Sequence, residues 1–331
     1  MENPEPLSNG GKFKNPGESS HGFADFLKWV FNRKRAEWPK WIESQPGAGP
    51  VSQMNADEIR VTYVNHSTFL IQADGMNILT DPIWSTRAGP LSFIGTKRIR
   101  APGIKFEELP PVDAVLVSHN HYDHMDMPTL KTLEKEFSPL FVVGLGNKKF
   151  LEKKGLKRVE ELNWCEKTYL SNGSSIFFVP AQHFSGRTPW NINKSLWGGF
   201  MIESSQGQIY YAGDTGFGNF FENLHANFSN IKVALLPIGA YEPRWFMSPV
   251  HMNPEDAVRA HQILKPNVSI GAHFGTFHLA DEGVDAPKEQ LEATLRENGI
   301  DPKEFIILNP GESVTLMPND TRNEGRMVVR S

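Results

Sequence analysis

The chain has 331 residues, of which 39% are hydrophobic and 22% are charged, and this ordinary composition predicts a folded globular protein. Its single cysteine, Cys165, excludes an internal disulfide framework and a zinc site built from cysteines, so any bound metal must be held by histidine and carboxylate side chains. The net charge of -4 argues against a dedicated nucleic-acid-binding protein, which usually carries an excess of basic residues.

The first 22 residues are polar and rich in glycine, proline and asparagine, and we expect them to form a mobile tail. They lack the basic start and apolar centre of a signal peptide. No run in the sequence approaches the roughly 20 apolar residues that a membrane-spanning helix needs. We therefore predict a cytoplasmic protein, for which any membrane contact is peripheral.

Residues 23–55 are predicted to form an amphipathic helical extension. Its apolar side chains recur at helical spacing in one stripe, made by Phe23, Phe26, Leu27, Val30 and Phe31. Basic residues flank the stripe, and a helix of this kind can lie on a membrane surface. Because tertiary packing accounts for most such stripes, we favour packing of this stripe on the main domain.

Residues 56–318 contain short apolar segments and helical patterns separated by turn residues, and they predict one α/β (α+β) catalytic domain. The expected strands span residues 59–64, 68–72, 76–80, 113–118, 175–181, 199–202, 208–212, 233–237 and 268–272. The expected helices span residues 127–137, 147–154, 254–264 and 287–298, and Asn253 is suited to cap the third of them. Residues 319–331 are predicted to be a C-terminal tail.

Histidine and aspartate gather in one short run. An apolar strand ends at His119, and His121, Asp123 and His124 follow it closely. Two histidines two positions apart on an extended backbone point to the same side. Zinc favours nitrogen and oxygen ligands of this kind, and a catalytic zinc site leaves a position open for water. Since only 11 residues of the chain are histidine, a chance cluster of three is improbable, and the run predicts a metal site.

Three further candidates for metal ligands follow predicted strands, and these are His183, Asp214 and His273. Each alone has the ordinary interpretation of a capping residue or a buried, hydrogen-bonded polar residue. Their occurrence in this order after the histidine-rich run is a far more specific indication of metal binding.

The order His-x-His-x-Asp-His, then His, then Asp, then His, resembles the metallo-β-lactamase superfamily. This resemblance implies a single large domain folded as a four-layer αββα sandwich, with the site at one edge of its two sheets. It implies two zinc ions per chain, with manganese or iron as alternatives. The implied ligands of one metal are His119, His121, His183 and Asp214, and those of the other are Asp123, His124, Asp214 and His273.

A closer similarity links nearly the whole chain to the N-acylphosphatidylethanolamine-hydrolysing phospholipase D family. It is carried by NHST at 65–68, TDPI at 80–83, SHNHYDH at 118–124, PIGAYEPRWFM at 237–247, PEDAVR at 254–259 and HFGTF at 273–277. It is weaker in the N-terminal tail and in residues 184–195. The similarity implies a phosphodiesterase that releases phosphatidic acid and an N-acylethanolamine from a phospholipid, and it also implies a homodimer.

The resemblance extends to residues around the metals. Catalysis is expected to depend on Asp123, Asp214 and His251. A histidine at the place of His251 would bind a phosphate oxygen or protonate the leaving alkoxide, and the ordinary alternative is an exposed loop histidine.

Further residues are expected to contact the substrate or support the ligands. Arg244 would bind a phosphate, or alternatively form an ion pair with Glu242. His66 and Asp81 are expected to brace metal ligands from behind. The complete set expected to contact the substrate is Tyr241, Glu242, Arg244 and His251.

Two alternative functions remain open. Lactonases, thioesterases, β-lactamases and nucleases of the superfamily share this ligand set, so a lactone or a soluble phosphodiester is an alternative substrate, although the acidic balance argues against a nuclease. The second alternative is a metal-stabilised binding protein without activity, although every expected ligand is present. A comparison of N-acyl phospholipid, lactone and soluble phosphodiester as substrates discriminates among these functions.

Overall fold

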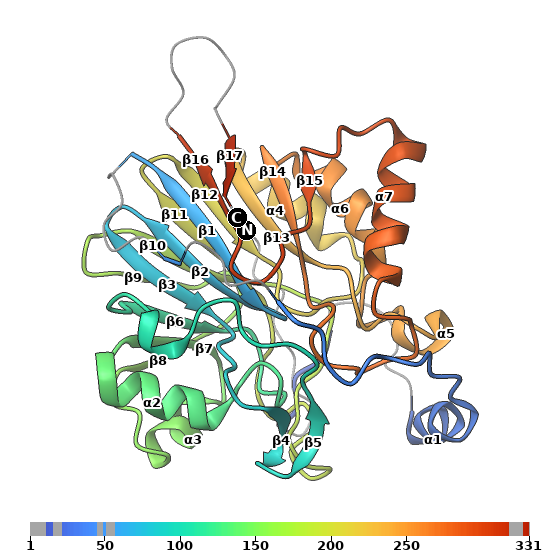
Figure 1. The fold of residues 1–331 in the computed structure, drawn as a ribbon. Helices are drawn as coiled ribbons and strands as arrows, with labels where there is room; N and C mark the ends of the chain where they lie inside the picture. The colour runs from blue at the N-terminus through green and yellow to red at the C-terminus, as the bar shows by residue number, and fades with distance from the viewer. Residues whose placement is uncertain (1–10, 16–21, 45–48, 51–56, 318–326, 331) are drawn as a thin grey trace.

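Two mixed β-sheets face each other and carry helices on their outer faces (Figure 1). The computed structural model describes residues 11–15, 22–44, 49–50, 57–317 and 327–330. The helices over one sheet are α2 (Met127–Phe137) and α3 (Lys148–Lys153), and those over the other are α4 (Phe220–Asn227), α6 (Pro254–Leu264) and α7 (Ala286–Asn298). This arrangement confirms the four-layer αββα sandwich predicted from the sequence.

The first sheet has eight strands in the order β17-β16-β1-β2-β3-β6-β7-β8. From β17 to β3, neighbouring strands are antiparallel, whereas β3, β6, β7 and β8 are parallel. β6 and β7 are buried along their whole length, as expected for parallel strands covered on both faces. The strands are β1 (Ile59–Asn65), β2 (Thr68–Ala73), β3 (Met76–Thr80), β6 (Ala114–Val117), β7 (Leu140–Gly144), β8 (Val159–Leu162), β16 (Ser313–Leu316) and β17 (Met327–Arg330).

The second sheet has seven strands in the order β15-β14-β13-β12-β11-β10-β9. Its strands β9 to β12 are antiparallel to their neighbours, and β12 to β15 are parallel, so both sheets combine an antiparallel and a parallel part. The strands are β9 (Lys167–Tyr169), β10 (Ser175–Val179), β11 (Gly199–Ser204), β12 (Gly207–Tyr211), β13 (Ile231–Pro237), β14 (Val268–Ala272) and β15 (Phe305–Ile306).

The main hydrophobic core lies between the two sheets. Because side chains alternate along a strand, Phe69 and Ile71 of β2 enter this core, whereas Leu70 joins the cluster under α2. Phe178 and Phe200 of the second sheet face the same central core. The packed inner faces fix the two sheets relative to each other, and therefore fix the loops at their ends.

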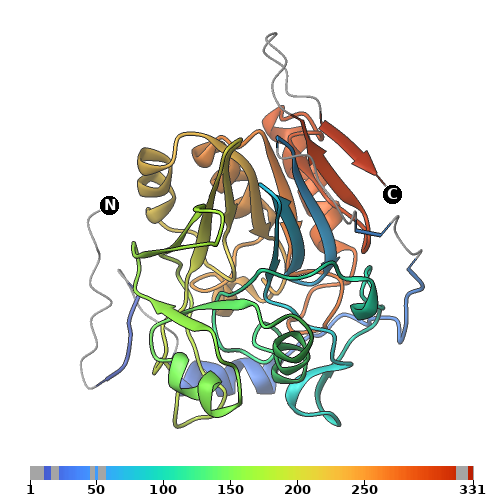
Figure 2. The same ribbon diagram turned by 90° about the vertical axis from the view of Figure 1, so that its left-hand side faces the viewer.

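Smaller elements lie outside the two sheets. A separate hairpin is formed by β4 (Arg87–Leu91) and β5 (Ile94–Lys97), and single turns are formed by η1 (Phe106–Glu108) and α5 (Arg244–Met247). The N-terminal helix α1 (Phe23–Asn32), in blue, and the hairpin, in teal, both lie at the lower end of the molecule in Figures 1 and 2.

All nine predicted strands and the four helices predicted for the catalytic domain are present, with small differences at their ends. The predicted helical extension over residues 23–55 is shorter than expected, because residues 33–44 are not helical and α1 ends at Asn32. The predicted cap is confirmed, since the side chain of Asn253 accepts a hydrogen bond from the main-chain N–H of Asp256 at 2.9 Å. The elements that the sequence analysis did not predict are the β4–β5 hairpin, η1, β7, β8, β9, α4, α5, β15, β16 and β17.

Both terminal segments differ from the predicted tails. Near the N-terminus, the main-chain N–H of Phe13 donates to the Asn193 carbonyl at 2.7 Å, so residues 11–15 lie against the main domain. Near the C-terminus, β17 extends the first sheet by pairing with β16. Residues 1–10, 16–21, 318–326 and 331 lie outside the described residues.

The N-terminal helix packs through a side that the apolar stripe does not include. Trp29 stacks on Phe246 of α5 with ring centroids 5.0 Å apart, and Arg33 forms an ion pair with Asp281 at 2.8 Å. The prediction that the stripe packs on the domain is wrong for its four members with described side chains, namely Phe26, Leu27, Val30 and Phe31, because all are exposed. Among the described residues, no helix is both long and apolar enough to cross a membrane.

Candidate metal centre

The candidate metal ligands converge from the carboxyl ends of strands in both sheets. In the first sheet, β6 leads to His119 and His121, and the turn before α2 carries Asp123 and His124. In the second sheet, β10, β12 and β14 are followed by His183, Asp214 and His273, respectively. The structure brings all seven predicted residues together.

The close approach of the two sheets requires a glycine. Gly213, which precedes Asp214, has a φ of +62°, and a Cβ atom there would lie 2.6 Å from the Cβ atom of Ser118. Glycine adopts this conformation without strain and leaves room for the neighbouring strand end. Gly213 therefore allows Asp214 to reach residues delivered by the opposite sheet.

The first cluster is formed by His119, His121 and His183, with Asp214 beside it. His119 Nε2 lies 2.8 Å from His121 Nδ1, which lies 3.3 Å from His183 Nε2. Asp214 Oδ2 lies 4.0 Å from His119 Nε2 and 3.8 Å from His183 Nε2. Two ligands about 2.1 Å from one tetrahedral zinc ion are roughly 3.4 Å apart, so these four atoms have the spacing of ligands to a single metal.

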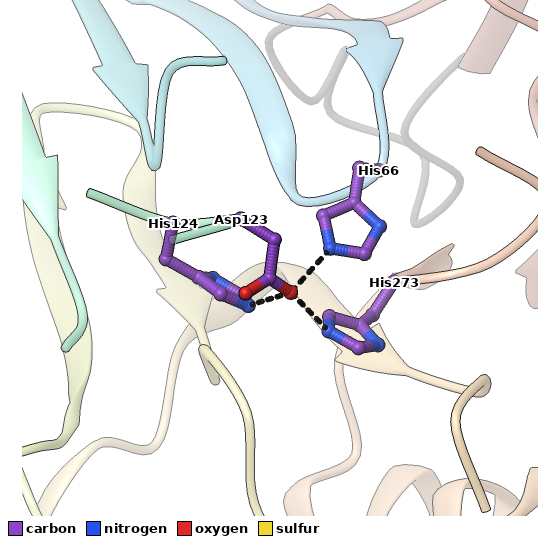
Figure 3. A group of neighbouring side chains, drawn as sticks. All are labelled: His66, Asp123, His124 and His273. Atoms are coloured by element: carbon purple, nitrogen blue, oxygen red, sulfur yellow. Dashed lines mark hydrogen bonds and ion pairs between the residues drawn. The ribbon is translucent and has the colours of Figure 1, made fainter. Parts of the chain in front are cut away.

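The second cluster is formed by Asp123, His124 and His273 (Figure 3). Asp123 Oδ2 lies 3.2 Å from His124 Nε2 and 3.4 Å from His273 Nε2. The same two nitrogen atoms lie 3.1 and 3.0 Å from Asp214 Oδ2. Asp214 thus contacts both clusters, as a ligand shared by two metals would.

Several buried atoms in the clusters have no hydrogen-bond partner within the part of the chain that the structure describes. They include Asp214 Oδ1, and also His124 Nε2 and His273 Nε2, which lie at ion-pair distance from Asp123 and Asp214 but form no hydrogen bond with them. A buried polar atom without a partner is costly, and a cation would satisfy imidazole nitrogen and carboxylate oxygen atoms together. The donor set and its unsatisfied atoms therefore fit bound metal ions.

Burial and neighbouring charges favour the metal-binding protonation states of His121, His183 and Asp214. Burial lowers the pKa of His121 to about 3, and it lowers the pKa of His183 to about 4. Burial favours protonation of Asp214, but the charges of His124 and His273 outweigh it and hold the pKa of Asp214 well below its usual value. Burial opposes protonation of His124 and His273, but the charge of Asp214 outweighs it and raises the pKa of His273 to about 9 and the pKa of His124 well above its usual value. Because neutral imidazoles and ionised carboxylates are the forms that bind metals, these two rings would release a proton when metal binds.

Asp81 lies behind two of the histidines. Its Oδ2 atom accepts hydrogen bonds from Tyr211 Oη and His124 Nδ1, each at 2.5 Å, and its Oδ1 atom accepts the Ser118 N–H at 2.7 Å. Ser118 Oγ also donates to Asp81, and it lies 2.9 Å from His119 Nδ1. These bonds engage Nδ1 of His119 and His124, and so direct Nε2 of both rings into the site.

His66 supports the second cluster in a similar way (Figure 3). Its Nε2 atom lies 3.0 Å from Asp123 Oδ2, and its ring centroid lies 4.2 Å from that of His273. His66, Asp81 and His273 have φ angles of 50°, 34° and 60°, in the left-handed region that residues other than glycine rarely adopt. Such conformations gather at functional sites, where surrounding contacts maintain them.

His251 lies beside the two clusters, in the loop before α6. Its ring centroid is 5.1 Å from that of His183 and 5.5 Å from that of His273. A ligand atom of His251 also lies within 4.8 Å of ligand atoms of His183 and Asp214. Burial lowers the pKa of His251 well below its usual value. This position excludes the alternative of an exposed loop histidine.

Arg244 contacts the main chain of His251. Its Nη1 atom donates to the His251 carbonyl at 2.9 Å, and its Nη2 atom pairs with Asp256 Oδ2 at 2.6 Å. The predicted ion pair with Glu242 is wrong, because Glu242 accepts the main-chain N–H of Arg244 instead. The neighbouring Tyr241 is buried, and burial raises the pKa of its hydroxyl group.

Several residues that support the ligands were not predicted from the sequence. Ser118 and Tyr211 donate to Asp81, and Asn15 contacts the main chain of His183. Ser118 is adjacent to the histidine-rich run, which is the only local indication of its role. Asn15 is 168 positions from His183, and no spacing in the sequence indicates such a contact.

Comparison with known proteins places these residues in a family. A family model described as a β-lactamase superfamily domain matches residues 76–274. The chain is 34% identical to N-acyl-phosphatidylethanolamine-hydrolyzing phospholipase D 1 of Caenorhabditis elegans, over 93% of each chain. It is 36% identical to the mitochondrial enzyme of that name from Saccharomyces cerevisiae, over 72% of this chain and 52% of the yeast protein.

A solved structure gives the same result. A metallo hydrolase from the archaeon Ignicoccus hospitalis matches with a TM-score of 0.60 and 25% identity, over 79% of this chain and all of that chain. The residues that the family model matches include β6, β10, β12 and β14 and the ligand clusters that follow these strands. The chain therefore belongs to the metallo-β-lactamase superfamily and is a metal-dependent hydrolase, similar along most of its length to N-acylphosphatidylethanolamine-hydrolysing phospholipase D.

Proposed function

We propose that the protein is a dinuclear zinc phosphodiesterase that cleaves N-acylphosphatidylethanolamine to phosphatidic acid and an N-acylethanolamine. The observation that carries this proposal is the pair of ligand clusters that share Asp214, in a chain similar to a phospholipase D over 93% of both lengths. The runs that resemble the phospholipase D family also surround these clusters, which supports a phosphodiester substrate.

Each cluster is assigned to one metal. The imidazole ligands in both clusters favour zinc over magnesium or calcium, which prefer oxygen ligands, and manganese and iron are the alternatives. When bound, two such ions supply a nucleophile at neutral pH by lowering the pKa of a water, and they neutralise charge that develops on phosphate oxygens. The proposed ligands are His119, His121, His183 and Asp214 for one metal, and Asp123, His124, Asp214 and His273 for the other.

The chain's own residues orient the site and the substrate. His251 lies beside both clusters, and it would donate a hydrogen bond to a phosphate oxygen or a proton to the leaving alkoxide. Arg244 holds the His251 carbonyl, so it positions His251, and Glu242 accepts the main-chain N–H of Arg244. His66 and Asp81 keep Asp123 and His124 oriented.

The lower end of the molecule carries exposed apolar side chains, and we assign it peripheral contact with a membrane. Phe31 of α1 is 82% exposed, Phe93 of the β4–β5 hairpin is 71% exposed, and Trp190 in the loop after His183 is 80% exposed. Phe184, also partly exposed, lies with its ring centroid 4.5 Å from that of His121. Exposed apolar side chains, one of which lies beside the metal centre, suit a substrate drawn from a bilayer.

The first test is the release of phosphatidic acid from micelles of N-acylphosphatidylethanolamine by the zinc-loaded protein. The matched variants are Asp214→Asn, which removes the shared carboxylate, and Asp301→Asn, which changes an exposed aspartate in the loop after α7. We expect release by the wild type and by Asp301→Asn. We expect loss of release and of metal in Asp214→Asn.

Other outcomes would redirect the assignment. A protein that holds two metals per chain without releasing phosphatidic acid would contradict the lipid substrate, and lactones and soluble phosphodiesters would be tested next. Metal binding without hydrolysis of any of these compounds would favour a binding protein. A homodimer is proposed as well, and light scattering that finds only monomer at micromolar concentration would contradict it.

A further inference from the structure

A segment near the N-terminus contacts the metal centre directly. The side chain of Asn15 donates from Nδ2 to the His183 carbonyl at 2.9 Å and accepts the His183 N–H at Oδ1 at 3.1 Å. The same Oδ1 atom accepts the indole N–H of Trp197 at 3.0 Å. One amide side chain thus satisfies both main-chain polar groups of His183, 168 positions along the chain.

His183 needs such a partner because it lies beyond the end of its strand. β10 ends at Val179, and the isolated bridge between Gln182 and Gly216 is the last sheet-like pairing before His183. Main-chain N–H and carbonyl groups buried beyond a strand end are costly unless another group pairs with them. Asn15 supplies this pairing from outside the sheet.

The segment that carries Asn15 is anchored independently. The main-chain N–H of Phe13 donates to the Asn193 carbonyl at 2.7 Å, and the half-buried Phe13 side chain packs against the core between the sheets. Asn193 in turn pairs with Ser185, through its main-chain N–H at 2.8 Å and its side-chain oxygen at 3.2 Å. Residues 13–15 are therefore bound to both ends of the loop that begins at His183.

We propose that Asn15 is a positioning residue of the metal centre. The ring of His183 is oriented from one side by its Nδ1–H, which donates to the Val250 carbonyl at 2.9 Å. Asn15 fixes the main chain on the other side, so together they direct His183 Nε2 toward the first cluster. This inference rests on the proposed role of His183 as a metal ligand. It makes the N-terminal segment part of the site.

The test compares zinc affinity and the rate of hydrogen exchange at the main-chain N–H of His183. The variants are Asn15→Ala, Asn15→Asp and the neighbouring exposed control Lys14→Ala. Competition with a chromophoric chelator measures the two zinc affinities, and hydrogen exchange measures the main-chain N–H of His183. Loss of a group that orients a ligand typically weakens metal binding by about 10- to 100-fold. For Asn15→Ala, we expect about tenfold weaker binding of one zinc ion and faster exchange at His183, with Lys14→Ala unchanged.

The two variants of Asn15 separate positioning from folding. Asn15→Asp keeps the acceptor for His183 and Trp197 but places an oxygen atom opposite the His183 carbonyl. We expect Asn15→Asp to weaken binding of the same zinc ion, and this variant tests the inference even if Asn15→Ala fails to fold. If a folded Asn15 variant has the zinc affinity of the wild type and the same rate of hydrogen exchange at His183, the inference is overturned. A wild-type protein that binds no zinc would instead contradict the proposed function, so the two failures are distinguishable.

Discussion

At Asp81, one carboxylate connects side chains of both sheets to the metal centre. It follows β3, it accepts Tyr211 Oη from β12 of the opposite sheet, and it accepts His124 Nδ1. The Asp81 and Tyr211 side chains are fully buried, so water does not compete for these bonds. Asp81 therefore orients a ligand without occupying a ligand position. Substitution of Asp81 is expected to weaken metal binding, whereas substitution of a ligand such as Asp214 is expected to abolish it.

The variant Asp81→Asn is expected to weaken zinc binding by about 10- to 100-fold while leaving the ligands in place. The reason is that the amide of asparagine presents two N–H donors where Asp81 accepts hydrogen bonds from Tyr211, Ser118 and His124. Competition with a zinc chelator measures the effect, with Asp301→Asn as the control. Unchanged zinc affinity in a folded Asp81→Asn protein would contradict the orienting role.

His261 lies in α6, outside the metal centre, and gives a prediction about pH. Its Nδ1 atom lies 2.9 Å from Ser269 Oγ, and burial lowers its pKa below the ordinary value of 6.5, although Glu304 acts in the opposite direction. The unfolded chain therefore binds a proton at a higher pH than the folded chain does. The contribution of His261 to the free energy of unfolding is complete above pH 6.5. It is lost as the pH falls from 6.5 toward the lowered pKa of His261.

The measurement is the free energy of unfolding of metal-free protein in denaturant, for wild type and His261→Gln, at several pH values between about 7.5 and 5. We expect the wild type to lose more stability over this range than the variant does. The metal-free form removes the contribution of metal release, which is common to both proteins. Parallel pH profiles would contradict the assignment of this dependence to His261.

Two separate elements, α1 and the β4–β5 hairpin, contribute Phe31 and Phe93 to the proposed membrane surface. The double variant Phe31→Ser with Phe93→Ser is expected to weaken binding to phospholipid vesicles by roughly tenfold or more, because burying one such side chain contributes about 1.5–3 kcal/mol. Val329→Ser on β17 is the control, since Val329 is 49% exposed and β17 lies at the upper end in Figure 1. Vesicle sedimentation makes the comparison, and equal binding of all three proteins would contradict this surface.

The sequence predicts those elements whose patterns are local. The metal ligands follow short apolar runs, so the strands before them can be derived from neighbouring residues, whereas the complete ligand set is implied by their order along the chain and its resemblance to the superfamily. The β4–β5 hairpin contains Gly89, Pro90 and Gly95, which are poor strand formers, and its two strands pair only with each other among the described residues. Helix α1 has a clear apolar stripe, but periodicity cannot indicate that Trp29, outside the stripe, would find Phe246 as its partner.

Contacts between distant segments are the part that the sequence could not predict. Tyr211 reaches Asp81 across the interface between the sheets, and Asn15 reaches His183 from the N-terminal segment. Neither residue type nor spacing distinguishes these side chains from other buried tyrosines or exposed asparagines. Such contacts follow from how the sheets pack, and packing is determined by the whole chain.

Over the whole molecule, the metal centre joins the two halves of the sandwich. Four candidate ligands follow β6 of the first sheet, and three follow β10, β12 and β14 of the second. The clusters therefore bridge the ends of both sheets, where the central apolar core gives way to buried polar groups. Metals bound there would stabilise the arrangement of the two sheets as well as the site.

Removal of metal is therefore expected to lower the melting temperature of the whole protein. A metal that binds only the folded state stabilises it by about 2.7 kcal/mol when its free concentration is roughly 100 times Kd, and this corresponds to several degrees in Tm. Scanning calorimetry with and without a chelator measures the change. Zinc should restore Tm, whereas magnesium should not, because the clusters are rich in imidazole. The Asp214→Asn protein serves as the control, since it should respond weakly to both chelator and zinc. If chelation removes the metals and Tm stays the same, the centre does not hold the two sheets together.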